Sequence, residues 1–203
     1  MNQILMNRNG PTWIYLRAKK LQDLLIVFIA LPFAGSVIAI LSIIHIMLYR
    51  SNPLFVSERV GKDNTTFKII KLKTMHDGTP LRATADLGNA NLYLTGLGRT
   101  VRKYSLDELP QILNVMTGDM SVVGPRPGLV SQVDLNLYRT RYGLSELRPG
   151  ITGLAQVIYR DQASDKLKGK VDRVYLKNMS LCLDLWILFV TLNQFAFPRN
   201  VRH

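Results

Sequence analysis

The stretch from Leu24 to Leu48, LLIVFIALPFAGSVIAILSIIHIML, contains no formally charged residue. It is longer than the ~20 apolar residues that a helix needs to cross the hydrocarbon core of a bilayer. It begins too far into the chain, and runs too long, for the apolar part of a cleavable signal peptide. The sequence therefore predicts an N-terminal membrane segment over residues 1–50 and a second, more polar domain over residues 51–203.

Basic residues flank this apolar stretch on both sides: Arg17, Lys19 and Lys20 precede it, and Arg50, Arg59 and Lys62 follow it. Positive charge marks the cytoplasmic end of a membrane helix, so two basic ends favour neither direction of crossing. Pro32 removes a backbone donor and predicts a kink or break near Leu31–Pro32. A re-entrant helix that returns to the face it entered fits both features, and a kinked transmembrane helix is the alternative.

The chain as a whole is both apolar and basic. Of its 203 residues, 47% are hydrophobic, and its formal net charge is +12. The apolar content argues against an intrinsically disordered chain, and the charge predicts a polyanionic partner such as nucleic acid, anionic membrane lipid or a phosphorylated small molecule. An aromatic content of 8% and the lack of a nucleic-acid-binding motif argue against nucleic acid. The single cysteine excludes an intramolecular disulfide.

Beyond the membrane segment, the pattern predicts an α+β fold that is mainly helical. Residues 51–65 are polar and rich in turn residues, and residues 66–75 (TFKIIKLKTM) alternate as a strand with a bulge where the alternation changes phase. Helices are expected over residues 105–116, 129–142, 166–178 and 181–197. The last of these is strongly apolar, which suits an interfacial amphipathic helix, with a core helix of the second domain as the alternative.

Two adjacent carboxylates, Asp107 and Glu108, stand in the segment RTVRKYSLDELPQ over residues 99–111. Ser105 and Glu108 have the spacing of a capping box, in which a serine and a glutamate bind the free backbone amides at the start of a helix. A purely structural role for the pair is therefore one interpretation, and chemistry is the other.

Arginines near this pair favour the chemical interpretation. Arg102 lies just upstream, and two loops, Gly124-Pro125-Arg126-Pro127 and Arg148-Pro149-Gly150, frame an arginine with proline and glycine. Rigid loops can hold a guanidinium for bidentate phosphate binding. Adjacent carboxylates repel a phosphate unless a cation lies between them, and Mg²⁺ takes carboxylate and phosphate oxygens together. Aspartate can also attack phosphorus. Because these carboxylates and arginines follow a membrane segment, the sequence predicts phosphoryl-transfer chemistry on a lipid substrate.

Four motifs follow one another along the chain: FKIIKLKTM at 67–75, RKYSLDELPQ at 102–111, GDMSVVGPRP at 118–127 and RPGITGLAQV at 148–157. Asp172, Tyr175 and Asp184 stand after them. With the basic-flanked apolar segment, these motifs resemble those of the bacterial sugar transferase family, the small monotopic phosphoglycosyl transferases. The resemblance covers residues 17 to 194, and it implies that the membrane segment is re-entrant.

The resemblance also implies an activity and a site. Members of this family transfer a sugar phosphate from a UDP-sugar to undecaprenyl phosphate at the cytoplasmic face of the bacterial inner membrane, releasing UMP and starting polysaccharide synthesis. Asp107 would be the nucleophile that forms a covalent aspartyl phospho-sugar intermediate, and Glu108 the ligand of Mg²⁺. The expected phosphate-binding residues are Lys73, Arg102, Arg126 and Arg148.

The partners implied are a UDP-sugar, undecaprenyl phosphate and anionic membrane lipid, without nucleic acid. The oligomeric state is open, with a homo-oligomer among the alternatives.

The chain departs from the family pattern where Leu31-Pro32 replaces Ser-Pro, where residues 158–161 read Ile-Tyr-Arg-Asp, and where Lys170 replaces a glutamate. The sequence therefore leaves the sugar and the glycan pathway open. The alternative function is a catalytically inactive membrane scaffold that binds anionic lipid.

Overall fold

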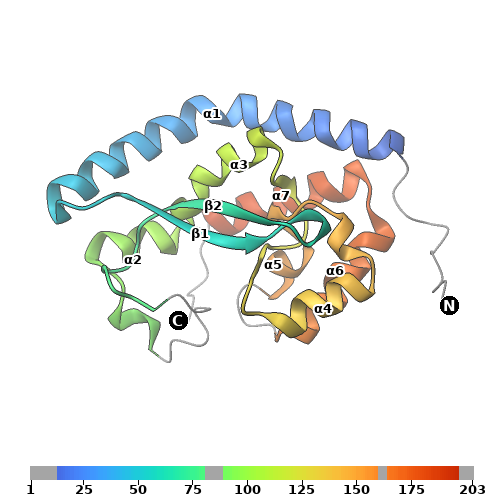
Figure 1. Cartoon of the computed structure of the whole chain (residues 1–203). Coiled ribbons are helices and arrows are strands. Elements are labelled where there is room, and N and C mark those ends of the chain that lie inside the picture. The colour runs from blue at the N-terminus through green and yellow to red at the C-terminus, as the bar shows by residue number, and fades with distance from the viewer. Residues whose placement is uncertain (1–12, 81–88, 160–163, 197–203) are drawn as a thin grey trace.

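The computed structural model describes residues 13–80, 89–159 and 164–196. A hairpin of β1 (Leu54–Val60) and β2 (Thr66–Leu72) crosses the middle of the molecule beneath the long helix α1 (Trp13–Tyr49) (Figure 1). The other helices are α2 (Gly96–Lys103), α3 (Ile112–Thr117), α4 (Val133–Arg141), α5 (Leu154–Tyr159), α6 (Asp165–Asn178) and α7 (Leu181–Ala196). The prediction of a mainly helical α+β fold is confirmed.

Helix α1 continues through Pro32 without interruption, so the described structure contains no break at Leu31–Pro32. Figure 1 shows α1 instead as an arch over the rest of the molecule. Proline bends a helix because it cannot donate a backbone hydrogen bond. Ser36 Oγ also donates to the Pro32 carbonyl at 2.9 Å, and a serine bonded to the carbonyl four residues earlier bends a helix further.

One stripe of α1 is buried against the rest of the molecule, residues beside it are partly buried, and the opposite side of the helix is exposed. The buried residues of this stripe are Lys19, Asp23, Val27, Ala34 and His45. The opposite side exposes large apolar side chains such as Phe28, Ile29 and Phe33, each more than 70% exposed. Among the described helices, α1 is the one long and apolar enough to cross a membrane.

The hairpin differs from the sequence-based expectation in two respects. Residues 51–65, expected as a polar and turn-rich stretch, contain β1, and its pairing with β2 runs without interruption from Leu54↔Leu72 to Val60↔Thr66. The bulge predicted for β2 is therefore wrong. Its apolar residues change phase because β2 is covered on both sides, so that Ile69 and Leu72, which point to opposite faces, are both buried.

Two segments far apart in the sequence meet in a parallel pair, β3 (Ser121–Val123) with β5 (Gly150–Thr152). Just beyond β3, the Gly150 N–H donates to the Pro125 carbonyl at 2.9 Å. The backbones approach so closely that a Cβ on Gly150 would overlap the backbone of Gly124. This contact braces the loop that follows β3 and therefore requires glycine.

The C-terminal helices close the core of the domain. Helix α6 confirms the prediction for residues 166–178, with Ser164 Oγ accepting from the Leu167 N–H at its start. Helix α7 buries Asp184, Ile187 and Thr191 on one side. Its other side exposes Leu185, Trp186, Phe189 and Leu192. The buried side fits the interpretation of α7 as a core helix, and contact of its exposed apolar side with a membrane interface stays a prediction.

Candidate active site

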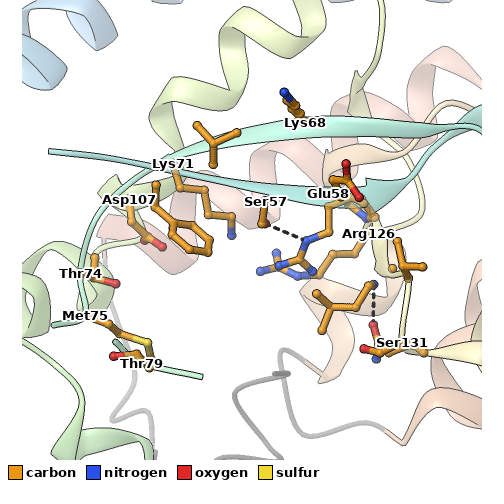
Figure 2. Close-up of a pocket in the computed structure, with 18 of the residues that line it drawn as sticks. Ser57, Glu58, Lys68, Lys71, Thr74, Met75, Thr79, Asp107, Arg126 and Ser131 are labelled. Carbon is orange, nitrogen blue, oxygen red and sulfur yellow. Dashed lines mark hydrogen bonds between the residues drawn. The ribbon is translucent and has the colours of Figure 1, made fainter. Parts of the chain in front are cut away.

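A cavity of about 730 Å³ opens beside the hairpin. Its walls are the hairpin, the residues that follow β2, the segment after Arg126, and side chains from α4, α5 and α6. Figure 2 shows the side chains of Asp107, Lys71 and Arg126 among the residues that line or border this cavity. The motifs singled out in the sequence therefore meet at one place.

The backbone around the carboxylate pair differs from the expected single helix over residues 105–116. A 3₁₀ helix, η4 (Leu106–Gln111), leads into α3, and the Ser105 side chain makes no cap hydrogen bond. Pro110 lies inside η4 and cannot donate to a preceding carbonyl. The Glu108 carboxylate is bound elsewhere, so the capping box predicted with Ser105 does not form.

Glu108 holds two cations that come from different parts of the chain. Lys71 Nζ on β2 lies 2.7 Å from Glu108 Oε1. Arg126, in the loop after β3, donates through Nη2 to Oε1 at 2.8 Å and through Nη1 to Oε2 at 3.4 Å. Although burial alone would raise the pKa of Glu108, Arg126 and Lys71 hold this pKa well below its ordinary value. Glu108 is thus an ionised carboxylate that fixes the position of both cations.

Of the two adjacent carboxylates, Asp107 is the one that lines the cavity. Its side chain is buried, with 8% of the residue exposed. Burial, and after it the charge of Glu108, raises the pKa of Asp107 above its ordinary value. Three nearby cations oppose this shift: Lys71, Arg102 and Arg126. A carboxylate among cations and shielded from water is suited to attack an anionic phosphorus centre.

Of the other residues predicted from the sequence, Lys73 and Arg102 also line the cavity. Lys73 Nζ lies 2.8 Å from Asp77 Oδ1. Arg148 is exposed and lies outside the cavity lining. The segment that contains Arg148 contributes through its backbone, because the adjacent strand β5 supports the loop that carries Arg126. Arg160 falls outside the described residues.

Several cations that line this cavity were not predicted as site residues, and Lys71 and Arg59 are the two that matter most for its charge. Lys71 was noted within a motif, but its partner Glu108 lies far along the chain. Arg59 was counted as a flank of the membrane segment, whereas it lies on β1 and faces the cavity with Ser57. Burial alternates along β1, but its sequence, LFVSERV, has apolar and polar residues on both faces, so no local pattern revealed Arg59.

Carboxylate oxygens are suitable donors for Mg²⁺, which is commonly bound through one or two carboxylates together with substrate phosphates and water. Within the described part of the chain, no group of three or more His, Cys, Asp or Glu side chains could hold a metal ion. Of the Asp107–Glu108 pair, Asp107 lines the cavity, where phosphate and water oxygens would have to complete a metal site. A cation on Glu108 would share its carboxylate with Lys71 and Arg126.

Comparison with known proteins gives relatives along most of the chain. It is 36% identical over 191 residues to the UDP-N-acetylgalactosamine-undecaprenyl-phosphate N-acetylgalactosaminephosphotransferase of Aeromonas hydrophila, covering 90% of this chain and 44% of that protein. It is 31% identical over 197 residues to the UDP-glucose:undecaprenyl-phosphate glucose-1-phosphate transferase of Klebsiella pneumoniae, covering 90% and 40%. The chain thus spans less than half the length of these two relatives.

A shorter relative matches over most of its own length. It is an uncharacterized sugar transferase of Bacillus subtilis, EpsL, 38% identical over 169 residues that cover 82% of each chain. The family model described as bacterial sugar transferase matches residues 14–198, which include every strand and helix named above apart from the first residue of α1. The chain belongs to the bacterial sugar transferase family.

Proposed function

We propose that this protein transfers a sugar phosphate from a UDP-sugar to undecaprenyl phosphate and so initiates the synthesis of a polysaccharide. Membership of the family and the names of the Aeromonas and Klebsiella relatives support this reaction class. The observation that carries the proposal is the position of Asp107. Its carboxylate lines the cavity and lies among cations that can neutralise a diphosphate.

In the first half-reaction, a carboxylate oxygen of Asp107 attacks the phosphorus that bears the sugar. A bond forms between this oxygen and the phosphorus, and the bond from the phosphorus to the bridging oxygen of the diphosphate breaks. UMP leaves with that electron pair, so no proton is required. Lys71 and Arg126 stabilise the charge on the phosphoryl oxygens, and their shared contact with Glu108 keeps them in place before the substrate arrives.

In the second half-reaction, a phosphate oxygen of undecaprenyl phosphate attacks the phosphorus of the covalent intermediate. The bond to Asp107 breaks, and its electron pair restores the carboxylate. The product is undecaprenyl-diphosphate-sugar. Because UMP leaves before the lipid reacts, the reaction follows ping-pong kinetics. We include Mg²⁺ as a cofactor, held by Glu108 together with phosphate and water oxygens, where it would neutralise phosphate charge.

We further propose that α1 is re-entrant and holds the protein on the cytoplasmic face of the bacterial inner membrane. Helix α1 contacts the domain near both ends: Lys19 binds Asp184, and the Leu97 N–H donates to Tyr49 Oη. A helix that crossed the bilayer would carry one of these ends away from the domain. The exposed apolar sides of α1 and α7 suit contact with lipid, and the basic flanks suit anionic head groups.

The test is UMP release from UDP-sugars in the presence of undecaprenyl phosphate and Mg²⁺. Asp107→Asn should lower the rate by about a thousandfold or more, because the variant lacks the group that forms the covalent intermediate. Asp134→Asn, which changes an exposed carboxylate outside the cavity, is the matched control and should keep the wild-type rate. Full activity of Asp107→Asn would refute the nucleophile, and full activity after chelation with EDTA would refute the metal.

A further inference from the structure

Arg59 is a cavity cation for which the reaction outlined above assigns no role. It lies near the end of β1, paired with Phe67 of β2 and with Leu129 of β4 (Gly128–Leu129). Its Nε donates to Ser57 Oγ at 3.4 Å, the contact drawn from Ser57 in Figure 2. Within the described ranges, no Asp or Glu forms an ion pair with Arg59. Glu108 acts on Arg59 as a more distant charge that partly offsets the effects of burial and of Arg126. A half-buried guanidinium without a carboxylate in direct contact is costly unless an anion binds it.

The charges around Arg59 show what kind of anion would fit. Glu108 is already shared by Lys71 and Arg126. Arg126 also lies close enough to Arg59 to act on its charge, because burial and then Arg126 lower the pKa of Arg59 to about 10. The group therefore stays positive at neutral pH, beside another guanidinium. These cations exceed the negative charge that Asp107 and Glu108 bring, so the cavity suits an anion with more than one negative charge.

The register of the hairpin places these cations at different points along the cavity. Lys71 is paired with Phe55, four positions before Arg59 on β1, which corresponds to about 13 Å along a strand. Lys71 is thus at the end where its partner Glu108 adjoins Asp107, and Arg59 is at the end where β1 meets β4. A diphosphate lying between them would present one phosphate to Asp107 and the other to Arg59.

We propose that Arg59 binds the phosphate of the departing nucleoside monophosphate, one phosphate further along the cavity than the one that Asp107 attacks. This assignment rests on the proposed function. During the first half-reaction, negative charge grows on the leaving phosphate as its bond to the attacked phosphorus breaks. Arg59 stabilises that charge. It has no such task in the second half-reaction, because UMP has already left.

The two half-reactions can be measured separately on the full-length protein in detergent. The first is the burst of UMP from UDP-N-acetylgalactosamine or UDP-glucose without lipid. The second is transfer from the isolated covalent intermediate to undecaprenyl phosphate. Arg59→Met should slow the first step about a hundredfold, as expected when one pre-organised charge donor is removed, and leave the second within about threefold. Arg59→Lys should give an intermediate rate, because it keeps the charge and loses the planar fork.

The matched control is Arg141→Met, which removes an exposed arginine outside the cavity lining and should change neither step. Product inhibition supplies a second readout: Arg59→Met should weaken inhibition by UMP at least tenfold and leave inhibition by uridine, which lacks the phosphate, unchanged. If Arg59→Met slowed both half-reactions equally, or slowed neither, the role proposed for Arg59 would be wrong, and the proposed function would still stand. If wild-type protein released no UMP from any donor, the proposed function would fail, and Arg59 with it.

Discussion

At the scale of single residues, Glu108 organises the cavity although Asp107 is the carboxylate that lines it. Its carboxylate joins a lysine from the hairpin to an arginine from the loop after β3. Because these elements come from different parts of the chain, the contact fixes both the charge and the shape of the site. We expect the cluster to contribute to stability as well as to phosphate binding.

Replacing Lys71 with methionine tests this contribution. The ammonium and the carboxylate are both largely buried, with 15% and 14% of their side chains exposed. Losing a charged hydrogen bond of this kind should lower the free energy of unfolding by about 1.5–3 kcal/mol, measured by denaturant unfolding in detergent. Lys68→Met, at an exposed position of the same strand, should stay within about 0.5 kcal/mol of wild type. Equal effects of the two variants would contradict the role of the Glu108 cluster.

The sequence predicted those site residues that stand in a recognisable motif and contribute their own side chain to the cavity. Asp107, Lys73, Arg102 and Arg126 are such residues, and all four line the cavity. Arg148 stands in an equally clear motif but lies outside the cavity lining. In that motif, Gly150 is the residue that the fold requires, because its backbone lies against Gly124. A motif does not reveal whether its arginine or its glycine is the part that the fold requires.

At the scale of elements, α1 is joined to the domain by a buried polar cluster rather than by apolar packing alone. Asp184 on α7 accepts hydrogen bonds from Lys19 Nζ at 2.7 Å, from Tyr175 Oη at 2.7 Å and from Tyr15 Oη at 3.1 Å. Asp23 accepts from Ser121 Oγ at 2.7 Å. Since Ser121 begins β3, the cluster connects the apolar helix to the strand that leads to the Arg126 loop.

Lys19→Met should weaken the attachment of α1 to the domain. Asp184 is 1% exposed, and the variant would remove the ammonium that lies 2.7 Å from its carboxylate. Removing one partner of a buried ion pair usually costs about 3–5 kcal/mol, so thermal unfolding in detergent should occur at a clearly lower temperature. Lys20→Met changes the neighbouring, exposed lysine and serves as the control. Identical melting temperatures for the two variants would show that the cluster does not hold α1 in place.

Long helices were easier to predict than strands. The apolar run of α1 and the basic pattern of α6 are local signals that span several turns. Strand β1 is as long as β2, but its apolar and polar residues do not alternate, and its pairing with β2 and β4 is not visible in a local pattern. The single helix expected from Ser105 divides into η4 and α3 because Glu108 binds Lys71 and Arg126 rather than the backbone at Ser105. Tertiary contacts decided both cases.

At the scale of the whole molecule, α1 is an arch with an apolar outer surface (Figure 1). Its buried stripe is polar at Lys19, Asp23 and His45 and apolar at Val27 and Ala34. The same helix therefore packs on the domain and presents exposed apolar side chains on its other side. In the proposed re-entrant arrangement, the cavity and both ends of α1 lie on one side of the bilayer. A lipid phosphate at the membrane surface would then be on the same side as Asp107.

Cysteine labelling tests this arrangement. Trp13→Cys at the start of α1 and Lys62→Cys in the hairpin turn are exposed positions, and each is combined with Cys182→Ser to remove the native thiol. A membrane-impermeant maleimide should label both positions from the cytoplasmic face only, in inverted vesicles and not in intact spheroplasts. Labelling of Trp13→Cys from the opposite face would show that α1 crosses the membrane.

The pairing of β3 with β5 also determines the order in which the protein matures. The chain is made from its N-terminus, so α1 is complete before either strand exists. The loop that carries Arg126 gains its support only when Gly150 and Thr152 have followed. A nascent chain therefore possesses its apolar helix well before its phosphate-binding loop is fixed. Any activity that needs the Arg126 loop therefore requires the synthesis of β5, about a hundred residues after the end of α1.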